Sequence, residues 1–133
     1  MVQSLGLLLL RVGAGGMMLA GHGWDKLFHF SEKVGQFPDP LGFGAGSSLA
    51  LAVFAEFFCS LLVILGVATR FAAAPLVVTM AVAACIVHAD DPWQAKEFAL
   101  VYALPFLTLI FTGGGDFSLD QVLWNSGSRR TRL

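Results

Sequence analysis

Four long apolar segments, separated by short polar stretches, dominate the hydrophobic pattern of the 133-residue chain. They cover residues 5–21, 44–66, 71–88 and 97–111. A helix needs about 20 apolar residues to cross the hydrocarbon core of a bilayer, and only the fourth segment is clearly short of the usual range. The pattern therefore predicts four membrane-spanning helices. We expect an all-α fold, an integral membrane four-helix bundle.

Two shorter segments complete the predicted fold. After the first span, four apolar side chains fall on one side of a helical wheel: Trp24, Leu27, Phe28 and Val34. This spacing predicts a short amphipathic segment on the membrane surface, ended by the prolines at 38 and 40. Three glycines at 113–115 end the fourth span. The stretch from Ser118 to Gln121 then has the form of a capping box and predicts a short C-terminal helix.

The basic residues give an orientation. Arg129, Arg130 and Arg132 lie in the C-terminal tail, and Arg70 lies between the second and third spans. Positive loops favour the cytoplasmic side, so we expect both termini to be cytoplasmic. We predict one transmembrane domain over residues 1–125 and a basic cytoplasmic tail over 126–133. Since Arg11 interrupts the first apolar segment, we interpret that segment as a retained helix and not a cleaved signal peptide.

Composition excludes a soluble globular domain, because 56% of the residues are hydrophobic and only 13% are charged. The formal net charge of −1 gives no reason to expect a nucleic-acid partner. The sequence has no phosphate-binding glycine loop, no haem attachment motif and no Cys-x-x-Cys pair. The lipid bilayer is the partner that the composition itself predicts.

Two ionisable residues lie deep inside predicted spans. Arg11 lies roughly 9 Å from the inner end of the first span and Glu56 roughly 15 Å from the inner end of the second. A charge at such depth costs roughly 2.5 to 3.5 kcal/mol on insertion scales, so it is kept by pairing or by function. Two interpretations stay open. Arg11 and Glu56 form a structural charge pair, or Glu56 handles protons or binds a ligand.

A second polar group is expected near the outer surface, where His22, Lys26, His88 and Glu97 fall at the ends of three spans. Such a ring could hydrogen-bond the head of a quinone and exchange its protons with water, because neutral histidine both donates and accepts. The alternative is that all four side chains extend to the interface and only anchor the helices. We predict no metal site, because the imidazoles and the carboxylate lack local ligand spacing.

Several of these residues fall in motifs that resemble one membrane-protein family. The motifs are GHGWDKL at 21–27, LGVATRFAA at 65–73 and GGGDFSLD at 113–120. Glu56 lies between the first two motifs, and the stretches from Met80 to His88 and from Glu97 onward lie between the last two. In this order and spacing the chain resembles the DoxX family of bacterial membrane proteins, from about residue 5 to residue 123.

The resemblance implies a four-helix bundle in the bacterial plasma membrane. It also implies an association with redox chemistry, since the family is similar to the membrane subunit of an archaeal thiosulfate:quinone oxidoreductase and has members linked to oxidant-defence complexes. The motif residues are site candidates without assigned roles: Arg11, His22, Lys26, Glu56, His88, Glu97 and Asp120.

Three functions remain open on these residues. In the first, the chain is a quinone-reactive membrane subunit of an oxidoreductase, with His88 and Glu97 at the quinone head and His22 or Lys26 in proton exchange. In the second, it is a non-catalytic scaffold for a partner enzyme. In the third, it is a small-molecule carrier in which Glu56 titrates. The first and second need a protein partner, and the third needs a homo-oligomer. Whether this chain itself catalyses a reaction is left open, and quinone is the one cofactor expected.

Overall fold

A computed structural model of the chain describes the backbone of residues 1–130 and the side chains of residues 1–127. Within that range the chain is built of helices and short loops, without strands. The α-helices are α1 Val2–Met18, α2 Trp24–Phe28, α3 Phe30–Lys33, α4 Ala45–Val53, α5 Ser60–Leu65, α6 Thr69–Val82, α7 Trp93–Thr112 and α8 Leu119–Arg130. Three π-helical turns lie between them: η1 Leu19–Gly23, η2 Phe54–Cys59 and η3 Ala83–Val87.

Four continuous helical rods are long and apolar enough to cross a membrane: Val2–Phe28, Ala45–Leu65, Thr69–Val87 and Trp93–Thr112. Their outer faces are oily, with Leu9, Phe71 and Phe111 more than 60% exposed. Since such surfaces need a lipid cover, the chain is an integral membrane protein. The predicted all-α membrane bundle, with a short amphipathic segment and a C-terminal helix, is confirmed.

Two of the predicted boundaries were wrong for a local reason. The first rod continues to Phe28 and does not end at residue 21, because the predicted amphipathic segment starts as a direct continuation of the same helix. The fourth rod begins at Trp93 and not at residue 97, because Pro92 occupies its N-cap position. Proline there loses no intrahelical hydrogen bond.

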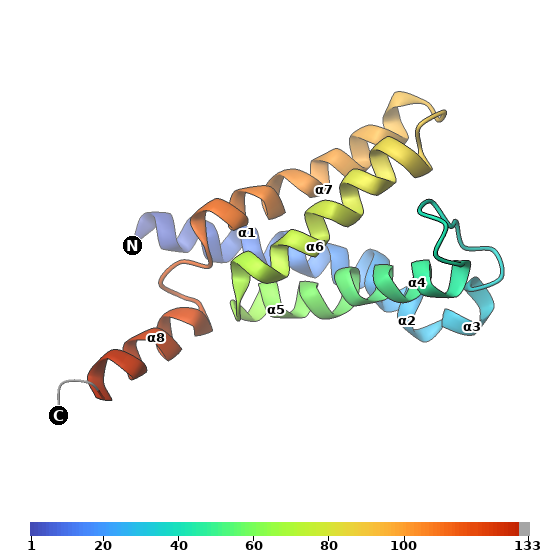
Figure 1. Cartoon of the computed structure of the whole chain (residues 1–133). Helices are drawn as coiled ribbons and strands as arrows, with labels where there is room; N and C mark the ends of the chain where they lie inside the picture. Colours follow the sequence, from blue (N-terminus) through green and yellow to red (C-terminus); the bar gives the residue numbers. More distant parts are fainter. Residues whose placement is uncertain (131–133) are drawn as a thin grey trace.

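The rods pack as two pairs that diverge at one end (Figure 1). α6 and α7 pack against each other as antiparallel neighbours, and α1 packs on α5. Where the pairs meet, the core contains fully buried side chains, among them Met18, Val63, Leu76 and Phe106. The pairs separate toward the end that holds α2 and α3. We call this the loop end, and the end that holds the N-terminus and α8 the terminal end.

The last described helix, α8, lies at the terminal end and extends away from the bundle (Figure 1). It starts as predicted, with Ser118 Oγ accepting from Gln121 N at 3.4 Å. The predicted basic tail starts at residue 126, and the backbone stays helical through Arg130. Residues 131–133 lie outside the described residues, so the rest of the predicted tail is not described. Trp124 in α8 is 80% exposed.

Candidate functional site

Each π-helical turn holds or precedes a titratable side chain. His22 lies in η1, Glu56 lies in η2, and His88 directly follows η3. A π turn has one residue more per turn than an α-helix, which rotates the following side chains, and such turns are frequent at functional sites. Three such turns, each beside a titratable side chain, therefore point to these residues as the candidate site.

The first two rods meet backbone to backbone at the loop end. A Cβ added to Gly23 would lie 2.2 Å from the carbonyl oxygen of Glu56 and 2.7 Å from the backbone nitrogen of Phe57. Only glycine permits such an approach, because any side chain would overlap the facing backbone. The contact places α2, which follows Gly23 directly, beside η2.

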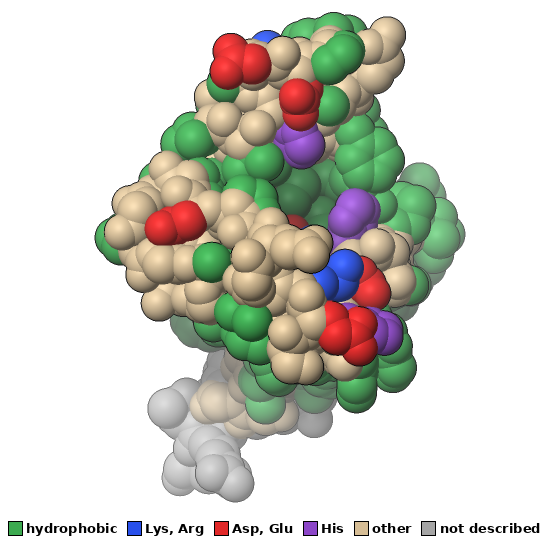
Figure 2. Space-filling model, turned by 90° about the vertical axis from the view of Figure 1, so that its right-hand side faces the viewer, with side chains coloured by type: hydrophobic (Ala, Val, Ile, Leu, Met, Phe, Trp, Pro, Cys, Tyr) green, Lys and Arg blue, Asp and Glu red, His purple; other side chains and the backbone are tan. Residues whose placement is uncertain are grey.

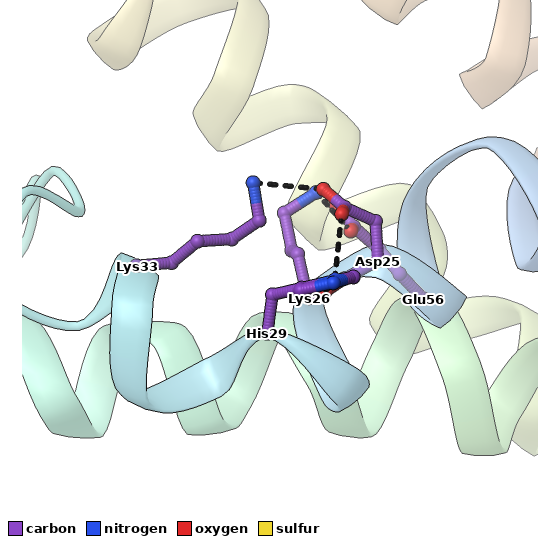
Figure 3. Close-up of polar contacts among 5 residues, drawn as sticks. All are labelled: Asp25, Lys26, His29, Lys33 and Glu56. Atoms are coloured by element: carbon purple, nitrogen blue, oxygen red, sulfur yellow. Dashed lines mark hydrogen bonds and ion pairs between the residues drawn. The ribbon is translucent and has the colours of Figure 1, made fainter.

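Lys26 forms an ion pair with Glu56 across this contact (Figure 3). Lys26 Nζ lies 2.5 Å from Glu56 Oε2, while 6% of the glutamate side chain and 18% of the lysine side chain are exposed. Although the charges touch, Glu56 Oε2 accepts no hydrogen bond of favourable direction among the described residues. The contact is therefore a close ion pair.

A cavity of about 520 Å³ opens between the two diverging helix pairs at the loop end. Figure 2 looks onto this end and shows a hollow with hydrophobic walls and with histidine side chains near its mouth. Most of the residues that line it are apolar, among them Leu51, Phe54, Val78 and Met80. Its titratable lining residues are His22, Lys26, Glu56, His88 and Tyr102. An apolar chamber with few polar groups is the usual form of a small-molecule site.

The two histidines are held in different ways. His22 packs against Tyr102, with ring centroids 5.4 Å apart in an edge-to-face arrangement, and against Phe98 at 5.7 Å. His88 Nδ1 lies 2.6 Å from Asp91 Oδ2. A carboxylate at Nδ1 accepts a hydrogen bond from that nitrogen, which leaves Nε2 as the ring nitrogen available to a ligand. His88 is therefore oriented by its neighbour, as a ligand-binding histidine requires.

The cavity contains four of the five predicted ligand or proton-handling residues, His22, Lys26, Glu56 and His88. The fifth, Glu97, is exposed and is not part of the lining. The α7 residues that line the cavity are Ala95, Phe98, Ala99 and Tyr102, which recur at helical spacing. Glu97 lies two residues from Ala95 and from Ala99 and so falls on the opposite face. Its predicted place in the ring was wrong.

Arg11 does not pair with Glu56, so the predicted structural charge pair was wrong. The fully buried guanidinium instead donates to four backbone carbonyls, those of Val63, Ile64, Gly114 and Phe117, at 2.8 to 3.2 Å. Side chains on a helix lean toward its N-terminus. Because the first and second rods are antiparallel, Arg11 leans toward the terminal end and Glu56 toward the loop end, and the two charges diverge.

Asp120 acts at the terminal end as a remote cap of α6. Its carboxylate accepts hydrogen bonds from Ala68 N at 2.6 Å and from Thr69 N and Thr69 Oγ1 at 3.0 Å. Burial alone would raise the pKa of Asp120, but these three hydrogen bonds and the charge of Arg11 hold that pKa below its usual value. Arg11 and Asp120 therefore join α1, α5, α6 and α8, and both act in the fold.

Sequence reasoning missed three residues of the site. Tyr102 and Phe98 form the aromatic wall on which His22 packs, and Asp91 orients His88. The chain has a single tyrosine, inside an apolar span and one helical turn after Phe98, which was a usable signal. Among the described residues no group of three or more His, Cys, Asp or Glu side chains is placed to hold a metal ion.

Comparison with known proteins identifies relatives of the chain. A model of the DoxX family matches residues 6–89, a range that includes His22, Lys26, Glu56 and His88. One protein from Haemophilus influenzae is 31% identical over 105 residues, which cover 75% of this chain and 70% of the relative. A second from the same organism is 34% identical over 106 residues, covering 71% and 79%.

Both relatives are described as uncharacterized proteins. No solved structure matches the chain. The family resemblance of the sequence motifs is thus confirmed by an independent match over more than half of the chain: the protein belongs to the DoxX family.

Proposed function

We propose that this chain is the quinone-binding membrane subunit of an oxidoreductase or redox-defence complex, and that the cavity at the loop end holds the quinone. One observation carries the proposal. An apolar chamber of about 520 Å³ is lined by two histidines and by the Lys26–Glu56 ion pair. Its volume falls within the roughly 300–1,000 Å³ of ordinary small-molecule sites.

The residues fit a quinone by their chemistry. A quinone joins an apolar ring and tail to two carbonyl oxygens, and the walls offer apolar contact from α4, α6 and α7. His88 is oriented by Asp91, so its Nε2 is the ring nitrogen left to face a ligand. His22 packs on Tyr102 and Phe98 and offers a second imidazole. Glu56 lines the same cavity, with its Oε2 held 2.5 Å from Lys26 Nζ.

Each residue then has a role that its surroundings support. His88 binds the quinone head, and His22 exchanges protons with it, since a neutral imidazole donates at one nitrogen and accepts at the other. A bound quinone supplies an acceptor for two electrons and two protons. The electrons come from a reduced centre on a partner protein that docks on the membrane subunit. Glu97 has no part in this account because it lies on the far face of α7.

Binding of a short-chain ubiquinone to the protein in lipid nanodiscs tests the proposal. We expect His88→Ala and His22→Ala each to raise the Kd at least about tenfold, which corresponds to about 1.4 kcal/mol. His29→Ala is the matched control, because His29 lies at the same end but outside the cavity lining. Wild-type protein that binds no quinone, or a His88 variant with unchanged affinity, would refute the assignment.

A non-catalytic scaffold is the second candidate, favoured by the exposed apolar side chains of α8. Val122, Leu123 and Trp124 are each more than half exposed on a helix that extends from the bundle. If the chain only docks an enzyme, a stoichiometric partner should copurify, and α8 deletion should release it. The histidine variants should then leave the activity of that complex unchanged. The carrier hypothesis instead predicts pH-linked solute uptake by vesicles that contain the protein.

We also propose that the chain lies in the bacterial plasma membrane with its terminal end in the cytoplasm. The arginines of the tail and Arg70 support this orientation through the positive-inside rule. Single cysteines at Gln36 and Asn125, in a chain whose two native cysteines are replaced, test it by labelling of intact cells. A membrane-impermeant thiol reagent should label position 36 from outside and leave position 125 unlabelled, and the reverse pattern would invert the orientation.

A further inference from the structure

A second, polar hollow of about 310 Å³ lies beside the apolar cavity at the loop end. Its lining residues are Gly21, His22, Asp25, Lys26, Glu32, Lys33, Gln36, Phe37 and Pro38. Five of these nine residues are charged or titratable. Unlike the apolar cavity, this hollow is therefore suited to water and to the movement of protons.

The two hollows share a wall. Four residues line both of them, and two of the four are titratable, His22 and Lys26. Glu56 lines only the apolar cavity. Lys26 thus contacts the polar hollow on one side and reaches the buried carboxylate of Glu56, 2.5 Å away, on the other. The ion pair stands where a polar space meets an apolar one.

The acidic side chain next to Lys26 in the sequence does not compete with Glu56 for the Lys26 ammonium. Figure 3 shows Asp25 in contact with Lys33 and His29. Lys33 Nζ lies 2.7 Å from Asp25 Oδ2, and His29 Nδ1 lies 3.0 Å from Asp25 Oδ1. The acidic neighbour of Lys26 in the sequence is thereby paired elsewhere, so Glu56 is the carboxylate in contact with the Lys26 ammonium.

We propose that Lys26 and Glu56 form a proton-transfer pair that carries protons between the polar hollow and the apolar cavity. The Lys26 ammonium gives a proton to the Glu56 carboxylate, which leaves a neutral amine and a neutral carboxylic acid. The amine takes a proton from a water molecule in the polar hollow and leaves hydroxide there, which diffuses into the bulk water, and the acid gives its proton to a ligand in the apolar cavity. Each transfer conserves charge and needs no oxidant.

Glu56 has little access of its own to water, since only 6% of its side chain is exposed. A proton that reaches it from the polar hollow therefore passes through Lys26, which lines that hollow. The other titratable groups facing this exchange are His22 in the shared wall, His88 and Tyr102 across the apolar cavity, and Asp25, Glu32 and Lys33 in the polar hollow. That the final proton acceptor is a reduced quinone rests on the proposed function, but the transfer pair itself does not.

Infrared spectroscopy of the ligand-free protein in lipid tests the pair without a quinone. The carboxylic acid band of Glu56, assigned by its loss in Glu56→Gln, should appear within the pH range in which the protein stays folded. After transfer to D₂O it should shift as the proton exchanges. Lys26→Arg keeps a cation beside Glu56 but replaces a group that can release its proton with one that stays charged. We expect exchange in this variant to slow at least about tenfold.

Lys33→Arg is the matched control, because Lys33 lines the same polar hollow but contacts Asp25 and not Glu56. Its exchange rate should equal that of the wild type. Absence of any Glu56 acid band in the wild type would overturn the proposal, whether or not the variants fold. Equal exchange rates in Lys26→Arg and the wild type would also overturn it. Failure of quinone binding in nanodiscs would refute the quinone assignment alone and leave this result standing.

Discussion

Gly23 and Glu56 touch through their backbones, and this contact positions the whole candidate site. A Cβ on Gly23 would lie 2.2 Å from the Glu56 carbonyl oxygen, so the first two rods cannot stay at their present separation with any other residue there. Because Lys26 follows Gly23 by less than one helical turn, the same contact places its ammonium on the Glu56 carboxylate.

Gly23→Ala is therefore expected to destabilise the protein by roughly 1 to 3 kcal/mol, the usual cost of overpacking. Thermal unfolding in detergent measures the effect. Gly21→Ala in the same π-helical turn is the control, because a Cβ at Gly21 meets no atom within 4 Å. Equal unfolding temperatures for the two variants would show that the helices do not approach so closely.

The two buried charges should be energetically independent of each other. A double-mutant cycle with Arg11→Met and Glu56→Gln should give additive effects to within about 0.5 kcal/mol, since Arg11 binds only backbone carbonyls. A parallel cycle with Lys26→Met and Glu56→Gln should give a coupling of about 0.5 to 3 kcal/mol, because these groups are in contact. Coupling between Arg11 and Glu56 would contradict the charge placement described above.

The contacts of the Asp120 carboxylate predict that part of the free energy of unfolding is lost at acidic pH. Its pKa in the folded protein is held below the usual value, chiefly by hydrogen bonds from Ala68 and Thr69 that outweigh the effect of burial. Such a group stabilises the fold above its unfolded pKa of about 3.9, and this contribution is lost as the pH falls through the lower folded value.

Asp120→Asn should therefore destabilise the protein at neutral pH, and the difference from the wild type should shrink as the pH falls below about 4. Unfolding measured over a pH series tests this. Asp90→Asn, at an exposed position in the turn before α7, should show no such trend. A constant difference between Asp120→Asn and the wild type at all pH values would rule out the capping role.

Two buried serines should respond in opposite ways. Ser60 Oγ has no hydrogen bond among the described residues, whereas Ser118 Oγ donates to Gly115 O at 2.6 Å and accepts from Gln121 N. Ser60→Ala removes an unpaired polar group and should be neutral or slightly stabilising. Ser118→Ala removes a helix cap and should cost about 0.5 to 2 kcal/mol. Comparable losses in both variants would indicate a partner for Ser60 that the present contacts do not include.

The fold followed from the sequence because membrane spans are marked by long apolar segments, and four of these are plain in the chain. The site followed only in part. His22, Lys26 and His88 were expected together because they lie at the outer ends of two spans, but the partner of Glu56 was misassigned. The pairing was predicted from the depth of each residue along its helix, which residue number gives. Each side chain also leans toward the N-terminus of its own helix, and this separates Arg11 from Glu56.

The π-helical turns were beyond prediction from residue patterns, since nothing local in their sequences distinguishes them from an α-helix. They rotate the side chains that follow, so the cavity lining could not be derived from ideal helical periodicity alone. Glu97 failed for a simpler reason. Ala95, Phe98 and Ala99 define the cavity face of α7. Small and aromatic residues of this kind occur on every face of a membrane helix, so the sequence did not show that Glu97 lies on another face.

Photolabelling with an azido-substituted ubiquinone, followed by peptide mass spectrometry, tests the central claim most directly. The account predicts that label falls on residues of the apolar cavity, in the segment that contains Phe37 to Phe43 and in the α7 segment that contains Phe98 and Tyr102. Excess unlabelled quinone should abolish it. Label spread over the lipid-facing residues Leu9, Phe71 and Phe111, unchanged by that competition, would contradict a quinone site in this protein.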